Sequence, residues 1–235
     1  MVVKVPLNRA LSKLGILSRV QATEAIRAGR VSVNGLVVRD PARLVVPERV
    51  RVAVDGESKA KIRWRTILLH KPRGVVTTRR DPEGRRTVFD VVGESSAGLS
   101  AVGRLDLATS GLLLMTTDTQ LANWITDPTH AVPRVYVVTV RGAVSPDTLK
   151  RLGPEVALRK ASRRESHLVV TLREGRNRQV RRMFDVVGHD VMRLKRVALG
   201  ALELGGLAPG QWRDLTRAEI GAAFPRRGSS DARAI

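Results

Sequence analysis

One carboxylate of this sequence is placed where it could act as a nucleophile. Asp106 lies between two leucines, and Thr109-Ser110-Gly111 follows shortly after it. A turn here would lead into the apolar run GLLLMTT and leave the carboxylate partly desolvated, so that it would need a cation to stay ionised. An ionised, oriented carboxylate can form a covalent intermediate with one half of a split substrate. The alternative is a turn or helix-cap carboxylate, the usual role of Asp beside Thr, Ser and Gly.

Several other kinds of catalytic centre are excluded by composition and spacing. The chain has no cysteine, which rules out disulfides, thiolate metal sites and a cysteine nucleophile. The four histidines, His70, His130, His167 and His189, lack the spacing of a zinc site such as HExxH, and no GxxxxGK loop is present. The acidic residues are dispersed, whereas a metal-dependent nuclease would cluster them. We therefore expect a reaction without a metal ion or cofactor.

The charge of the chain indicates a polyanionic partner. There are 42 Lys and Arg residues against 22 Asp and Glu residues, a net charge of +20. Such an excess favours RNA or DNA as the partner. With only three Trp, three Phe and one Tyr, rows of stacked aromatic rings are not expected, so charge and shape would dominate recognition.

A membrane surface is the rival polyanion, and the sequence does not favour it. Stable attachment would need an amphipathic helix or a lipid anchor, and neither pattern is found. No apolar run approaches the roughly 20 residues that span a bilayer. The N-terminal residues MVVKVPLNRA also lack the apolar region of a signal peptide, so a cytoplasmic location is expected.

The elements at the start of the chain predict a small basic module. Apolar residues at helical spacing predict a helix over 7–14, and Ser18 can cap a second helix that runs through 19–28. Alternating residues around Asn34-Gly35 predict a hairpin, and the alternation in 49–56 predicts a further strand.

The remainder of the chain alternates strand-like and helix-like runs. A polar stretch over 57–65 indicates a domain boundary, after which ILLHK, GLLLMTT, VYVVTV and HLVVTL read as strands. Helices are predicted over 119–126, 145–152 and 176–187. We therefore predict an α+β protein with a small basic module over 1–60, a larger domain over 61–225 and a disordered tail over 226–235.

Two sets of motifs resemble known families. The helix pair, SRVQATEAIRAGRVSVNG and the hairpin resemble the RNA-binding domain of ribosomal protein S4. The segment GRLDLATSGLLL resembles the catalytic signature of the RsuA/RluB-type pseudouridine synthases, and HKPRGVVTT, PRVYVVTV and EGRNRQVRRMFDVVGH occur in the family's order around it. The resemblance covers nearly the whole chain and implies a catalytic domain with a mixed, mainly antiparallel sheet.

The resemblance also implies roles for individual residues. Asp106 matches the nucleophile, Arg181 the cation that pairs with it, and Tyr136 the residue placed against the target base, with stacking and proton handling as its roles. Arg104 matches the residue that helps occupy the position of the flipped base. At Arg134 the family has Lys, so the charge is kept. A lone Tyr on a strand is otherwise a packing residue.

The RNA contacts are expected at basic residues of both domains. Each single arginine could equally belong to a solvated helix face, but as a set they suit a row of phosphates. The run from Arg173 to Arg196 combines an apolar helix face with outward arginines. The expected RNA-binding residues are Arg9, Lys13, Ser18, Arg19, Arg27, Arg30, Arg104, Arg176, Arg178 and Arg182.

The sequence thus predicts an enzyme that isomerises one uridine of ribosomal RNA to pseudouridine, with the large subunit favoured by resemblance. Its partner would be ribosomal RNA or a pre-ribosomal particle, and a monomer is expected because no coiled-coil heptads are present. The alternative is a non-catalytic RNA-binding factor in ribosome assembly. A nuclease is a third hypothesis, disfavoured by the scattered carboxylates.

Overall fold

The computed structural model describes residues 4–47, 49–58 and 64–225. Contacts within the chain separate two compact units, one of residues 1–65 with 117–120 and one of residues 66–116 with 121–235. The tail predicted over 226–235 lies outside the described residues, and the domain limits predicted at 60 and 225 stay predictions. Among the described residues, no helix combines the length and apolar character needed to cross a membrane.

The first unit begins with the two predicted helices. Helix α1 (Leu7–Lys13) and helix α2 (Arg19–Arg27) bury Leu7, Leu11 and Ile26 in a common core. The expected cap of α2 is confirmed: the Ser18 hydroxyl accepts from the backbone N–H of Gln21, and the Gln21 side chain accepts from the backbone N–H of Ser18.

Short antiparallel strands complete the first unit. Asn34 and Gly35 both have positive φ, 53° and 87°, as the predicted two-residue hairpin requires. Four strands pair in the order β3-β2-β5-β6, and β1 pairs with β4. Their bounds are β1 (Val5–Pro6), β2 (Val31–Val33), β3 (Leu36–Val37), β4 (Leu44–Val45), β5 (Val52–Val54) and β6 (Glu57–Ser58).

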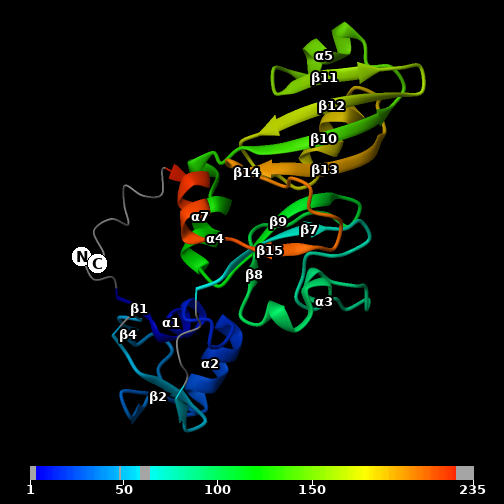
Figure 1. Cartoon of the computed structure of the whole chain (residues 1–235). Helices are drawn as coiled ribbons and strands as arrows, with labels where there is room; N and C mark the ends of the chain where they lie inside the picture. Colours follow the sequence, from blue (N-terminus) through cyan, green and yellow to red (C-terminus); the bar gives the residue numbers. More distant parts are fainter. Residues whose placement is uncertain (1–3, 48, 59–63, 226–235) are drawn as a thin grey trace. The chain divides into compact units, whose positions relative to one another are not determined.

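A nine-stranded sheet forms the centre of the second unit (Figure 1). The main path runs β11-β12-β10-β13-β9-β7-β15, with β14 paired to β13 and β8 to β9. Only the β13–β9 pair among these strands is parallel. Their bounds are β7 (Thr66–Lys71), β8 (Ser100–Ala101), β9 (Ser110–Thr116), β10 (Arg134–Arg141), β11 (Val156–Ala161), β12 (Glu165–Leu172), β13 (Val191–Leu199), β14 (Leu202–Glu203) and β15 (Trp212–Asp214).

Short helices flank this sheet. Residues 119–126 are helical as predicted, whereas the helix predicted over 176–187 begins three residues later. The helices are α3 (Val88–Val92), α4 (Thr119–Thr126), α5 (Pro146–Leu152), α6 (Gln179–Val186) and α7 (Arg217–Ala223), with 3-10 turns η1 (Gly93–Ser96) and η2 (Pro128–His130). The chain is therefore an α+β protein with a mixed, mainly antiparallel sheet.

The core of the second unit has two parts that meet near the middle of the sheet. Val180 and Phe184 of α6 pack with strands β10, β12 and β13 in one part. Strands β7 and β9 pack with α3 in the other. Tyr136 of β10 packs against both parts, and its side chain is half-buried. Asp106, Leu105 and Tyr136 lie together at this junction.

Candidate active site

Asp106 lies in a tight turn between β8 and β9. Its backbone carbonyl accepts a hydrogen bond of 3.0 Å from the N–H of Thr109, which closes the turn. The side chain of Asp106 is half-buried, whereas its neighbours Leu105 and Thr109 are buried. The carboxylate therefore reaches solvent from a turn whose flanks are fixed in the core.

Three residues that follow or end β7 hold this turn in place. The Lys71 ammonium donates to the backbone carbonyls of Asp106 (3.1 Å), Thr109 (2.8 Å) and Pro72 (3.0 Å). The Gly74 N–H donates to the carbonyl of Leu107. The Thr77 hydroxyl donates to the carbonyl of Leu105 and accepts from the N–H of the same residue.

Lys71 holds the Asp106 turn, a role that was not predicted from the sequence. Its side chain is fully buried, and burial lowers its pKa from 10.5 to about 8, while the charge of Asp106 opposes the shift. A lysine at the end of the apolar run ILLHK, inside HKPRGVVTT, was the available signal. Its target lay 35 residues further along the chain, so the sequence did not reveal what it binds.

Arg181 of α6 reaches the same turn. Its guanidinium donates to the carbonyl of Ala108 (3.3 Å) and to that of Val191 (3.0 Å), rather than to the Asp106 carboxylate. Burial and the nearby charge of Arg178 lower its pKa, whereas Asp106 raises it. The expected direct pair with Asp106 is thus present only as an attraction between two charges.

The register of strands β10, β13 and β9 places Tyr136 near the Asp106 turn. Tyr136 is the cross-strand partner of Arg196, and Arg196 is also the partner of Gly111 across the parallel β13–β9 pair. A side chain on Gly111 would collide with the Arg196 backbone, and the φ of Gly111 is +110°. A glycine directly after the Asp106 turn therefore lets β13 approach closely.

Asp106, Tyr136 and Arg196 line one cavity of about 540 Å³. Four of its side chains are sequence candidates besides Asp106: Arg104, Tyr136, Arg176 and Arg178. Arg181 and Arg182 are not among the lining residues. The lining carries five arginines and two carboxylates: Arg104, Arg134, Arg176, Arg178 and Arg196, against Asp106 and Glu174. The charged lining of the cavity is therefore mainly cationic, and its volume is within the usual range of a ligand site.

Unpaired buried polar atoms also gather at this turn. Within the part of the chain that the structure describes, three buried side-chain atoms have no hydrogen-bond partner: Oγ1 of Thr109, Nε of Arg181 and Nη2 of Arg196. Thr109 belongs to the turn, Arg181 binds it at Ala108, and Arg196 binds the adjacent strand at Leu112. Because such atoms are nearly always paired in folded proteins, these three are available to bind a ligand or a water molecule at this turn.

The N-terminal end of α6 carries the remaining catalytic-domain candidates. Arg178 precedes the helix in a left-handed conformation, with φ of +49°, which costs a non-glycine residue energy and is common at functional sites. Arg176 forms an ion pair of 3.0 Å with Glu174, which also accepts from Gln179. Arg178 and Arg182 are exposed.

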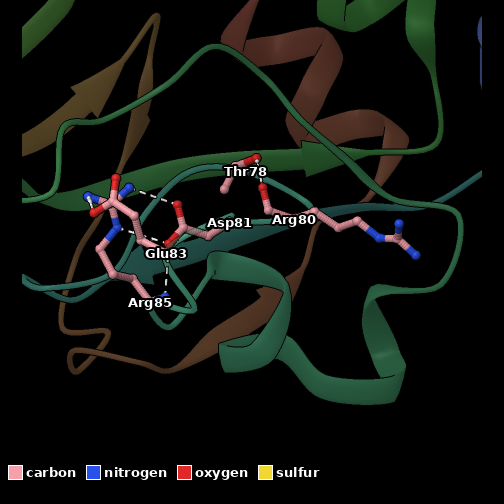
Figure 2. Close-up of polar contacts among 5 residues, drawn as sticks. All are labelled: Thr78, Arg80, Asp81, Glu83 and Arg85. Atoms are coloured by element: carbon pink, nitrogen blue, oxygen red, sulfur yellow. Dashed lines mark hydrogen bonds and ion pairs between the residues drawn. The ribbon is translucent and has the colours of Figure 1, made fainter.

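A charged turn lies just beyond Thr77 (Figure 2). The Arg85 guanidinium donates to both carboxylate oxygens of Asp81, at 2.9 and 2.7 Å, and pairs with Glu83 at 3.0 Å. The carbonyl of Arg80 accepts from Thr78, and the exposed Arg80 side chain points away from these carboxylates (Figure 2). The Arg80 side chain, which was not predicted as a site residue from the sequence, is therefore a solvent-exposed cation.

In the first unit, the candidate RNA-binding residues differ in whether their side chains are already engaged by other residues. Arg9, Arg19 and Arg27 are exposed. Arg30 is held by Asp55 through two bonds of 2.6 Å, and the Ser18 hydroxyl caps α2. The side chain of Lys13 lies outside the described residues.

Most of the chain matches known proteins. The family model for RNA pseudouridylate synthase matches residues 65–185, and the model for the S4 domain matches residues 5–50. A crystal structure of a pseudouridylate synthase matches with a TM-score of 0.65 and 29% identity over 93% of this chain and 99% of that one.

Relatives that match along most of their length also carry the name pseudouridine synthase. An uncharacterized RNA pseudouridine synthase of Aquifex aeolicus is 38% identical, over 94% of both chains. Proteins named ribosomal large subunit pseudouridine synthase B are 35% identical in Bacillus subtilis, over 91% of this chain and 93% of the relative, and 39% identical in Escherichia coli K12, over 91% and 80%.

The fold, the cavity at Asp106 and these matches define an RNA pseudouridine synthase, an isomerase. The chain belongs to the RNA pseudouridylate synthase family, in the RsuA/RluB-type group whose catalytic domain follows an S4 domain.

Proposed function

We propose that this enzyme converts one uridine of large-subunit ribosomal RNA to pseudouridine, with Asp106 as the nucleophile. The observation that carries the proposal is the meeting of Asp106 and Tyr136 in one cationic cavity, beside buried donors that lack partners. A cavity built only to bind RNA has no use for a carboxylate facing a polyanion. This argues against the non-catalytic assembly factor.

The chemistry of Asp106 follows from the two bonds that change. The bond from uracil N1 to ribose C1′ breaks, its electron pair goes to the uracil, and a carboxylate oxygen of Asp106 bonds to C1′. The uracil turns, and its C5 bonds to C1′ as the carboxylate leaves. C5 then loses its proton and N1 gains one, so that nothing is oxidised, reduced or hydrolysed.

Tyr136 and Arg181 support this step. The half-buried Tyr136 ring lines the cavity and would stack on the uracil, with its hydroxyl available for proton transfer near C5. The Arg181 charge attracts the Asp106 carboxylate, and the bond of Arg181 to the carbonyl of Ala108 keeps the turn oriented. A shorter Arg181–Asp106 contact in the RNA complex would agree with the expected pairing.

The target base must leave its stack to reach Asp106, at a cost of a few kcal/mol. Arg104, exposed beside the nucleophile, would occupy the vacated position. Phosphates would be held by Arg176, Arg178 and Arg182, with Arg80 as a further contact. In the S4 domain, Arg9, Lys13, Ser18, Arg19, Arg27 and Arg30 would contact structured RNA, with the free arginines contributing most.

The finer features of the proposal concern the substrate and the cellular setting. The relatives named for the large ribosomal subunit support that subunit as the source of the RNA. Ribosomal RNA or a pre-ribosomal particle as substrate would place the enzyme in the cytoplasm. We propose that it acts without a cofactor, because the isomerisation needs no redox or energy-supplying partner. A monomer stays the expected state, because the sequence has no coiled-coil heptads.

The test maps pseudouridine on transcribed large- and small-subunit ribosomal RNA after incubation with the purified protein. Carbodiimide-dependent reverse-transcription stops reveal each product, and RNA binding is measured in parallel. One modified site in the large-subunit RNA is expected. A site in the small-subunit RNA would correct the substrate, whereas tight binding without any product on RNA or on pre-ribosomal particles would favour the assembly factor.

A further inference from the structure

Arg196 is a buried cation with an unused donor at the cavity. Its side chain is 3% exposed and lines the cavity. The Nε donates to the carbonyl of Leu112 at 2.8 Å, but the buried Nη2 has no acceptor among the described residues. No ion pair joins Arg196 to a carboxylate in that part of the chain. A buried charge without a partner is costly.

Arg134, a second buried arginine of the cavity lining, provides a comparison because its terminal nitrogens are all paired. Arg134 is 7% exposed and also lines the cavity. Its guanidinium donates to the carbonyls of Val132 (2.8 Å), Arg173 (3.3 Å) and Ile125 (3.2 Å), so both terminal nitrogens have acceptors. Backbone acceptors can thus satisfy a buried arginine in this cavity lining, and the fold does not require Arg196 to keep an unpaired donor.

The position of Arg196 is fixed from both sides. Tyr136 lies opposite it on β10, so the two side chains leave the same face of the sheet. On β9, its partner Gly111 has no side chain and follows the Asp106 turn within five residues. A ring stacked on Tyr136 and joined to a ribose at Asp106 would lie within reach of the free donor.

We propose that Arg196 donates a hydrogen bond to one exocyclic carbonyl oxygen of the target uracil, O2 or O4. The proposal rests on the proposed function, because it takes Asp106 and Tyr136 as the groups that hold the nucleotide. A flipped nucleotide enters base first, so the buried end of the cavity meets the carbonyl oxygens, and the phosphates remain at the mouth with the exposed arginines.

This contact would strengthen during the reaction. When the N1–C1′ bond breaks, the electron pair left on uracil spreads onto its carbonyl oxygens. A fixed cation in a water-poor site stabilises such developing charge more than it stabilises the neutral base. Arg196 would thus lower the barrier to bond cleavage and hold the detached uracil, and it returns to its starting state once C5 has bonded to C1′.

The test pairs a protein change with a change of one substrate atom. Single-turnover rates are measured for wild type and Arg196→Lys on an RNA fragment that carries uridine, 2-thiouridine or 4-thiouridine at the mapped target. Sulfur accepts hydrogen bonds weakly, so wild type should slow about tenfold or more on one thio-substrate. Arg196→Lys should be slow on uridine. Its rate should not fall further on the thio-substrate, so the thio effect, which is the ratio of the uridine rate to the thiouridine rate, should be lost.

Arg134→Lys is the matched control. A merely structural arginine leaves the thio effect at its wild-type size, whatever the loss of rate on uridine. The inference is overturned if the thio effect persists in full in Arg196→Lys, or if neither thio-substrate slows wild type, a result that needs no variant to fold. Wild type that binds the uridine RNA without converting it would overturn the proposed function itself, and this inference with it.

Discussion

The ammonium of Lys71 lies 2.8 Å from the backbone carbonyl oxygen of Thr109 and 3.1 Å from that of Asp106, so one side chain joins both ends of the turn that carries the carboxylate. The bonds are made by a cation in the core, where water cannot replace them. A buried donor that satisfies several carbonyls fixes a turn more firmly than the turn's own single hydrogen bond.

Replacing this cation should therefore lower the rate. Lys71→Met provides a linear side chain of similar length but removes all three hydrogen bonds, so Asp106 loses its fixed position. A displacement of about 1 Å at a nucleophile costs up to about a hundredfold in rate, and we expect a loss of tenfold to a hundredfold with RNA binding unchanged. Single-turnover kinetics check this, with the exposed Lys150→Met as control. Full activity of a folded Lys71→Met protein would contradict it.

The low pKa of Lys71 predicts a pH-dependent stability. The folded protein releases this proton near pH 8, whereas the unfolded chain retains it up to about 10.5. Unfolding therefore takes up a proton between these values, and the contribution of Lys71 to the free energy of unfolding rises with pH in that window, by at most about 1.4 kcal/mol per pH unit.

Urea unfolding of wild type and Lys71→Met at several pH values measures this contribution, because the other titrating groups cancel in the difference. Below pH 8 the difference should be constant. Between pH 8 and about 10.5, the free energy of unfolding of wild type should rise relative to that of Lys71→Met. A difference that moves against wild type over this window would mean that burial does not lower the pKa of Lys71.

Gly111 should tolerate no side chain. Its φ is +110°, and an added methyl group would meet the backbone of Arg196, which cannot move without breaking the β13–β9 pair. Gly111→Ala should destabilise the protein by about 2 kcal/mol or more. Gly206→Ala, where nothing lies within 4 Å, is the control and should change little. Equal stabilities of the two variants in urea would count against this packing.

Binding to RNA should weaken with salt and do so through the free arginines. Removing one phosphate contact lowers the slope of log affinity against log salt by about 1. Arg19→Gln and Arg27→Gln should each show such a loss. Arg30→Gln should show less, because Asp55 already neutralises that guanidinium. The slopes come from affinities measured across a salt series, and an affinity independent of salt would refute the electrostatic account.

Local patterns were enough to predict the helices of the S4 domain, its Asn34-Gly35 hairpin and four strands of the catalytic domain. Strand β13 was not predicted. Its sequence VMRLKRVAL mixes cations with apolar residues without regular alternation, and the burial of Arg196 depends on a glycine more than eighty residues earlier. Motif resemblance selected Asp106 and Tyr136, which share one cavity. The tasks of Lys71 and Arg196 depend on long-range contacts that no local pattern encodes.

The central claim is that Asp106 attacks the ribose, and the most direct measurement compares Asp106→Asn with wild type under single-turnover conditions on the mapped target. The amide keeps the size of the side chain but removes the nucleophilic charge. Asp147→Asn, an exposed carboxylate on α5, is the control. We predict that Asp106→Asn binds the RNA as wild type does and forms pseudouridine at least about a thousandfold more slowly. Conversion by Asp106→Asn at a rate close to that of the control would contradict the account.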